Sequence, residues 1–149
     1  MVETILIGEN DPQQRKMLCL MLGKKLGYKT LEAEDGRAVV QQLESSNLGE
    51  IDAVLLDINM PGADGFEVLS RIRKYRPDIP VIMLTAMDDA KLAVKAIKAG
   101  ASDFIVKPPE PALLDISIKN AIRLSVLGRE LTRLKRDQEN AMGFADLIG

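Results

Sequence analysis

Short apolar runs alternate with segments of helical spacing along the first 110 residues of the chain. Four runs have the length and composition of strands buried on both faces: 4–7, 53–56, 81–84 and 103–106. A fifth segment, 28–33, alternates apolar and polar side chains as an edge strand does. Helical spacing fills the intervals, over 12–26, 37–45, 66–75 and 88–99. Strands that alternate with helices predict an α/β domain, with a five-stranded parallel sheet and right-handed crossovers.

Helix boundaries carry their usual residues. Asp11 followed by Pro12 predicts a helix start, with Gln14 at the spacing of a capping box, and Gly27 predicts the helix end. Breaks at Met60-Pro61-Gly62 and Asp64-Gly65 separate the third strand from the next helix. The residues expected to face the core are Leu18, Met21, Leu22 and Leu26, then Val39, Val40 and Leu43, and then Leu92, Ala93, Ala96 and Ile97.

The last helix is longer than a five-stranded sheet requires. It begins near Ala112, and its extension carries four leucines at 3-4-3 spacing: Leu124, Leu127, Leu131 and Leu134. Polar neighbours leave this stripe as the only apolar face, although Gly128 inside it costs about 1 kcal/mol relative to alanine. We expect a homodimer through this helix. The alternative is that the stripe packs on an output domain.

The composition of the chain excludes several classes of function. The 149 residues carry a net charge of −2, which gives no electrostatic case for direct nucleic-acid binding. The chain has no histidine, which excludes histidine metal ligands, general bases and phosphodonors. Cys19, the single cysteine, reads as a packing residue in a reducing compartment. The sequence has neither a signal-peptide pattern nor a long apolar span, so we expect a cytoplasmic protein without membrane contact.

Polar residues stand where four of the predicted strands end. The ends of the first, third, fourth and fifth strands deliver Glu9 with Asn10, Asp57, Thr85 and Lys107. Each has an ordinary interpretation alone, such as a loop cap for Asp57 or a solvated charge for Lys107. At one edge of a parallel sheet, however, carboxylate and amide oxygens suit Mg²⁺, and a carboxylate beside Mg²⁺ can attack phosphorus. Lysine and a hydroxyl can then stabilise a transferred phosphoryl group.

The motifs that carry these residues resemble a known family. The segments 9–12, 57–65, 84–86 and 103–108 are similar to those of the receiver domain of bacterial two-component response regulators, over about residues 3–122. The resemblance implies a flavodoxin-like doubly wound sheet of order 2-1-3-4-5. It also implies that the chain takes a phosphoryl group from a sensor histidine kinase or phosphotransfer protein. Such a chain is not an enzyme in the ordinary sense, but it catalyses its own phosphorylation and dephosphorylation.

The resemblance also assigns roles to individual residues. Asp57 would be the phosphoacceptor, and Thr85 and Lys107 would contact the phosphoryl oxygens. Phe104 would be the aromatic residue that rotates with Thr85 when the domain switches. The Mg²⁺ ligands would be Glu9, Asn10, Asp57 and, through its backbone carbonyl, Asn59.

One departure from the family pattern affects the metal site. The family usually has two aspartates where this chain has Glu9 and Asn10. Asn10 offers a neutral oxygen in place of a carboxylate, so we expect weaker Mg²⁺ binding. Glu9 is one methylene longer than aspartate and can reach further, and Gly8 provides room for that reach.

The sequence also suggests how the chain is organised. We expect a receiver domain over 1–122, a linker or dimerisation helix over 123–142, and the start of an output domain over 143–149. The last two segments resemble the linker that enters the AAA+ domain of enhancer-binding transcription activators, which points to transcription regulation. The alternative is a free-standing receiver domain with an irregular C-terminal tail.

Two other functions compete with the phosphoacceptor. A pseudo-receiver would keep the fold and act only as a phosphorylation-independent protein-binding module, and Asn10 supports this alternative. A flavodoxin-like or nucleotide-binding enzyme is disfavoured, because the first strand lacks a following glycine-rich phosphate loop.

Overall fold

The computed structural model describes residues 2–46, 50–60 and 63–148. The predicted turn at Pro61 and Gly62 lies outside these residues, as does Gly149 at the end of the expected output stub. Within the described part of the chain, no helix is both long and apolar enough to cross a bilayer.

Five parallel strands form the central sheet. They are β1 (Thr4–Gly8), β2 (Lys29–Ala33), β3 (Ala53–Asp57), β6 (Val81–Thr85) and β7 (Asp103–Val106). Their order is β2-β1-β3-β6-β7, which confirms the predicted doubly wound order. A small antiparallel pair, β4 (Asn59–Met60) and β5 (Ala63–Asp64), was not expected from the sequence. Each of its strands has two residues, which is too short for a recognisable alternation of apolar and polar positions.

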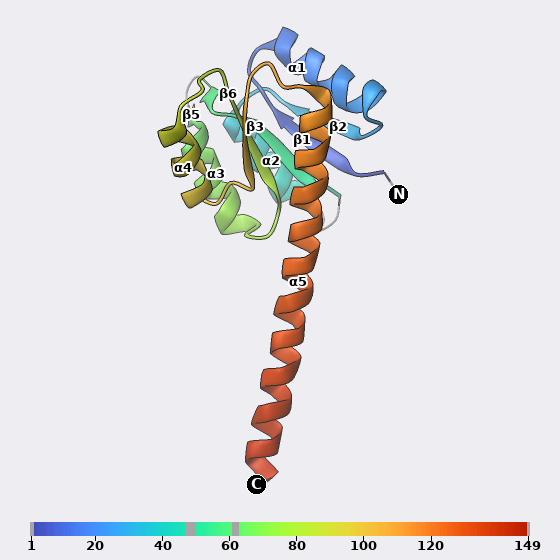
Figure 1. Cartoon of the computed structure of the whole chain (residues 1–149), viewed down its shortest axis with the longest axis vertical. Helices are drawn as coiled ribbons and strands as arrows, with labels where there is room; N and C mark the ends of the chain where they lie inside the picture. The colour runs from blue at the N-terminus through green and yellow to red at the C-terminus, as the bar shows by residue number, and fades with distance from the viewer. Residues whose placement is uncertain (1, 47–49, 61–62, 149) are drawn as a thin grey trace.

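Helices cover both faces of the sheet (Figure 1). They are α1 (Pro12–Leu20), α2 (Gly36–Ser45), α3 (Gly65–Tyr75), α4 (Ala90–Lys98) and α5 (Pro111–Ile148), with a π-helical segment, η1 (Met21–Lys25). The prediction of one α-helix up to Gly27 is therefore wrong in its last turns. There the N–H of Leu26 bonds five residues back to the carbonyl of Met21. Gly27 does end the segment, with a φ of 81° that suits glycine.

Two apolar clusters fill the space between the sheet and its helices. One joins inward side chains of the sheet to Val39 and Leu43 of α2, to α3 and to Ala96 of α4. The other joins the opposite face to Leu18, to η1 and to α5, and Cys19 packs against it half-buried. All five residues of β3 are buried, as expected for a strand covered on both faces.

The predicted inward faces of the helices are confirmed with one exception. Leu18, Leu22, Val39, Leu43 and Ala96 are buried, and Met21, Leu26, Val40, Leu92 and Ala93 are partly buried. Ile97 was also expected to face inward, but 51% of it is exposed. Helix α4 has nine residues and contacts the sheet mainly through Ala96, so its apolar positions outnumber those that the sheet can cover.

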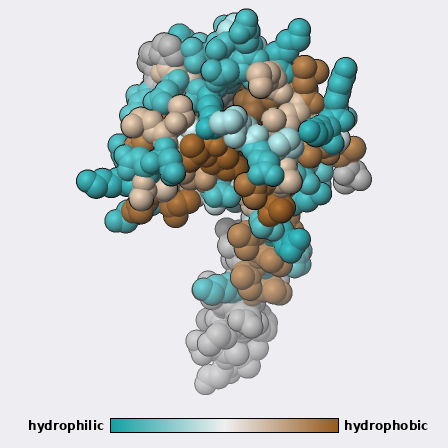
Figure 2. Space-filling model, turned by 45° about the horizontal axis from the view of Figure 1, so that its top comes forward, coloured by the Kyte–Doolittle hydropathy of each residue, from teal (hydrophilic) through white to brown (hydrophobic). Residues whose placement is uncertain are grey.

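Helix α5 continues far beyond the domain (Figure 1). Where it leaves, the hydroxyl of Ser125 donates to the backbone carbonyl of Asp78, and Arg129 Nε lies 3.6 Å from an Asp78 carboxylate oxygen. The four stripe leucines are between 51% and 67% exposed. Hydrophobic residues accordingly appear on the coloured part of the extension in Figure 2.

Candidate functional site

The register of the sheet brings the predicted site residues to one edge. Gly8 at the end of β1 pairs with Leu56, so Glu9 follows beside Asp57. Asp57 pairs with Leu84, the residue before Thr85. Thr85 pairs with Val106, and Lys107 comes next. Four strands thus end at the same level, which places their last side chains around one point.

Lys107 lies between the acidic side chains at this edge of the sheet. Its Nζ is 3.1 Å from Asp57 Oδ2 and 3.0 Å from Glu9 Oε2. The two carboxylates are buried, since only 5% of Asp57 and 1% of Glu9 is exposed. One ammonium therefore holds two buried acids, and it does so by charge-assisted hydrogen bonds, which are stronger than neutral ones.

The remaining carboxylate oxygens also have donors. Asp57 Oδ1 accepts the N–H of Asn59 at 3.1 Å, and Glu9 Oε1 accepts the N–H of Asp11 at 3.2 Å. Arg15 fixes the backbone of Glu9, because its Nη1 donates to the Glu9 carbonyl at 2.8 Å. The site is therefore ordered by the fold itself.

The charge within the site is unbalanced. Two carboxylates face one ammonium, and burial, followed by the neighbouring Asp57 carboxylate, raises the pKa of the Glu9 carboxyl above its usual range. Lys107 acts in the opposite direction on that pKa but does not cancel the burial effect. A second cation would relieve this excess negative charge.

The donor set fits Mg²⁺. Hard oxygen atoms of one or two carboxylates, completed by water, are the usual protein ligands of this ion. Among the described residues, no group of three or more acidic, cysteine or histidine side chains could hold a metal ion. Neutral oxygens or water would therefore complete the coordination, and Asn10, half-buried beside Glu9, offers one such oxygen. The side chain of Asn59 is exposed, so only its backbone suits the predicted role.

The two predicted switch residues lie on neighbouring strands. Thr85 is fully buried at the end of β6, and its Oγ1 accepts the N–H of Met87 at 3.1 Å. The backbone carbonyl of Thr85 accepts the N–H of Lys107 at 2.6 Å, which ties the two site residues together. Phe104 is partly buried on β7 and packs against the apolar cluster beneath α4.

One residue of the site was assigned a different role from the sequence. Gln14 was expected to complete a capping box, yet its Oε1 accepts from Lys107 Nζ at 2.7 Å. The box prediction is wrong because Glu9 takes the N–H of Asp11, and Asp11 caps the helix through the N–H of Gln13. The spacing of Gln14 from Asp11 was equally compatible with either partner, and only the position of β7 decides between them.

Comparison with known proteins agrees with this geometry. Residues 5–119 match the response regulator receiver domain family. The chain is 37% identical over 120 residues to a cyclic di-GMP phosphodiesterase of Thermotoga maritima, which aligns 80% of this chain and 31% of that protein. It is 35% identical over 125 residues to the phosphate regulon transcriptional regulatory protein PhoB of Escherichia coli, covering 83% of this chain and 53% of PhoB. The chain thus spans about a third to a half of the length of these relatives.

A solved structure shows the same fold. NtrX from Brucella abortus, in complex with ADP, superposes with a TM-score of 0.81 at 30% identity, over 90% of this chain and 30% of that one. The sheet order, the acids at the strand ends and the family match over residues 5–119 lead to one conclusion. The chain belongs to the response regulator receiver domain family of two-component systems.

Proposed function

We propose that this chain is a phosphoacceptor switch in which Asp57 takes a phosphoryl group from a phosphohistidine. The donor is a sensor histidine kinase or a phosphotransfer protein, since this chain has no histidine of its own. The observation that carries the proposal is the pair of buried carboxylates, Glu9 and Asp57, that share the ammonium of Lys107.

The transfer is a displacement at phosphorus. A carboxylate oxygen of Asp57 forms the new bond to phosphorus, the bond from phosphorus to the donor's imidazole nitrogen breaks, and that nitrogen keeps the electron pair and takes up a proton. Lys107 lies within reach of the phosphoryl oxygens, and the hydroxyl of Thr85 can turn toward them. The same groups act when water later releases phosphate, so the domain catalyses both reactions on itself.

Mg²⁺ would be held by the carboxylates of Glu9 and Asp57, the amide oxygen of Asn10 and the backbone carbonyl of Asn59. When bound, it supplies positive charge that stabilises the phosphoryl oxygens during transfer. Because Asn10 is neutral, we propose that the site needs a higher Mg²⁺ concentration than one with a third carboxylate.

The phosphoryl group changes the charge at the strand ends. It adds about −1.5 to −2 charges beside Lys107 and Thr85. We propose that both residues move toward it, that Phe104 turns inward behind Thr85, and that the surface made by α4, β7 and α5 repacks. Since one relative is a transcriptional regulatory protein, the repacked surface is proposed to control a C-terminal output domain that acts in transcription.

Phosphorylation can be tested directly. The protein is incubated with acetyl phosphate and millimolar Mg²⁺, and the phosphorylated fraction is read by intact-protein mass spectrometry and by NMR. We expect phosphorylation of the wild type and of Asp88→Asn, an exposed control, and none of Asp57→Asn. The Asn10→Asp variant should reach half-maximal phosphorylation at lower Mg²⁺. An unmodified wild type, beside a receiver that responds under the same conditions, would contradict the proposal.

A second candidate function is a phosphorylation-independent pseudo-receiver. It is favoured by Asn10, whose neutral amide leaves Glu9 and Asp57 as the two carboxylates available to hold a metal ion. The two functions differ in a cellular reporter assay. If wild type and Asp57→Ala regulate the output equally while Asn10→Asp strengthens Mg²⁺ binding, the protein-binding module is correct.

We also propose that the chain forms a homodimer through the extension of α5. The extension is expected to serve as a linker and dimerisation helix over 123–142, followed by the start of an output domain over 143–149. The apolar stripe Leu124, Leu127, Leu131 and Leu134 is exposed in the single chain, and burial of such side chains drives coiled-coil pairing.

Sedimentation velocity tests the dimer. The wild type should sediment as a dimer at high micromolar concentration, and Leu127→Glu/Leu134→Glu should sediment as a monomer. Val126→Glu is the matched control, because Val126 is also exposed but lies outside the leucine stripe. A wild type that stays monomeric removes the dimer from the mechanism and leaves the stripe to an output domain.

A further inference from the structure

Every N–H group of the Lys107 ammonium has a hydrogen-bond acceptor in this structure. The ammonium has three N–H groups, and three acceptors surround it: Glu9 Oε2 at 3.0 Å, Asp57 Oδ2 at 3.1 Å and Gln14 Oε1 at 2.7 Å. A phosphoryl group on Asp57 brings further acceptor oxygens to the same ammonium. At least one of the existing bonds must then break.

Gln14 is the partner that can be replaced at the lowest cost. Its amide is neutral and exposed, so water can take its place on either side of the broken bond. Glu9 is charged and almost fully buried, so its charge-assisted bond to the ammonium is stronger than the bond from the neutral amide of Gln14. Asp57 is itself the acceptor, and its phosphoryl group remains next to Lys107. The chemistry of the three partners therefore singles out Gln14.

We propose that Gln14 is a positioning residue that holds Lys107 in the unphosphorylated state and releases it when Asp57 is phosphorylated. This inference rests on the proposed phosphoacceptor function. In the resting domain the amide oxygen of Gln14 competes with the phosphoryl group for one ammonium proton. A stronger acceptor at position 14 slows phosphorylation, and a non-acceptor speeds it.

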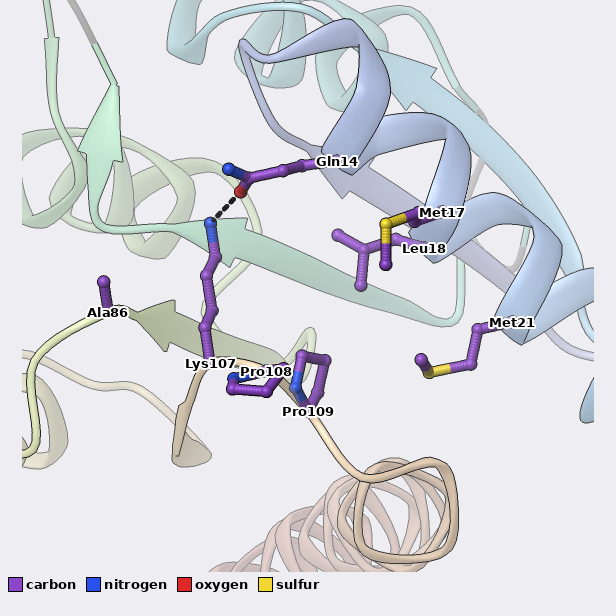
Figure 3. A pocket seen from close by; sticks show the side chains of 8 residues that line it. All are labelled: Gln14, Met17, Leu18, Met21, Ala86, Lys107, Pro108 and Pro109. Atoms are coloured by element: carbon purple, nitrogen blue, oxygen red, sulfur yellow. Dashed lines mark hydrogen bonds between the residues drawn. The ribbon is translucent and has the colours of Figure 1, made fainter.

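When its bond to Lys107 breaks, the side chain of Gln14 borders an open groove. Gln14 stands in the wall of a groove of about 370 Å³ between α1 and the segment after β7, beside Met17, Met21, Pro108 and Pro109. Figure 3 shows Gln14 and Met17 on α1 and Met21 at the start of η1, with Lys107 reaching across to Gln14 from the opposite side. Breaking the bond between Gln14 and Lys107 therefore changes the α1 side of this groove.

The resting-state bond is tested without any phosphorylation. Lysine side-chain NMR reports the ¹⁵Nζ–H signal of Lys107, which a triple hydrogen bond protects from exchange with water. In Gln14→Met, which keeps the length and removes the acceptor, we expect a shifted signal and faster exchange. Gln13→Met is the control, since Gln13 is the exposed neighbour on the same helix. An unchanged Lys107 signal in Gln14→Met overturns the inference, whatever the protein does with acetyl phosphate.

The rate of phosphorylation at saturating Mg²⁺ tests whether Gln14 competes with the phosphoryl group for Lys107. Relative to wild type, Gln14→Met should take up the phosphoryl group about threefold to tenfold faster, the effect of one lost hydrogen bond. Gln14→Glu should be about tenfold slower, because a carboxylate binds the ammonium more strongly than an amide. Gln13→Met and Gln13→Glu control for hydrophobicity and charge on α1 and should match wild type. A purely structural role would slow both Gln14 variants, and that result overturns the inference. Failure of every variant, wild type included, would instead refute the phosphoacceptor function.

Discussion

Replacing Lys107 with methionine should leave two buried carboxylates without their shared cation. Glu9 Oε2 and Asp57 Oδ2 each lie close to the same nitrogen, at 3.0 and 3.1 Å. The two oxygens are thus at most about 6 Å apart, and two unit charges at that separation repel by about 3 kcal/mol at an effective dielectric constant of about 20. We therefore expect Lys107→Met to lower the free energy of unfolding by about 3 kcal/mol at pH 7 without metal.

The loss of stability in Lys107→Met should be smaller at lower pH. In the variant, repulsion adds to the burial that already raises the pKa of Glu9. A carboxyl group whose pKa is higher in the folded state than in the unfolded state contributes fully to stability below its unfolded-state pKa. That contribution is lost as the pH rises through the folded-state pKa. The folded variant should therefore take up a proton at a higher pH than the unfolded chain does. The difference from wild type should therefore be smaller at pH 5 than at pH 7, because protonation of Glu9 removes the charge repulsion.

Urea unfolding in EDTA at pH 7 and pH 5 measures both differences. Lys119→Met is the matched control: it also removes one positive charge, but its side chain is 64% exposed and pairs with Asp115 at the surface. The control should change stability by less than about 0.5 kcal/mol at either pH. If Lys107→Met is equally destabilised at both pH values, charge repulsion is not the cause and the account of the site is refuted.

Further predictions concern packing and a buried hydroxyl. Gly65→Ala should destabilise the domain by about 3 kcal/mol or more in urea unfolding, because the new Cβ would lie 2.7 Å from Ile58 Cα, a backbone atom that cannot turn away. Gly128→Ala, whose Cβ meets nothing within 4 Å, should instead stabilise the helix by about 1 kcal/mol, and a loss there would contradict the helical extension. Tyr28→Phe removes the hydroxyl that donates to Asp115 at 2.6 Å and should cost about 1 kcal/mol at neutral pH. That hydrogen bond lowers the pKa of Asp115, whereas burial, and then the same bond, raises the pKa of Tyr28. The cost should therefore be greatest between about pH 5 and pH 9, and it should fall in acid as Asp115 is protonated and in alkali as the phenol ionises. An equal cost at pH 3 and pH 7 would contradict this assignment.

The sequence by itself determined the layers of the fold and the sheet edge that carries the site. Apolar runs of four residues separated by helical spacing leave a parallel sheet as the arrangement that buries both faces, and β3 is buried throughout. Polar residues after those runs had to meet at one edge, because parallel strands all end on the same side. Glu9, Asp57, Thr85 and Lys107 were found in that way, and the structure brings them together.

Only the tertiary structure determined which hydrogen-bond and packing partners these residues have. Local spacing placed Gln14 in a capping box, whereas Lys107, 93 residues away in sequence, takes its amide oxygen. Ile97 looked like a core position from its helical spacing, but the sheet beneath α4 does not reach it. The π-helical turns of η1 likewise have no sequence signal that distinguishes them from α-helix. In each case the outcome depends on how closely another element approaches, and a periodic pattern of hydrophobic and polar residues carries no information about that distance.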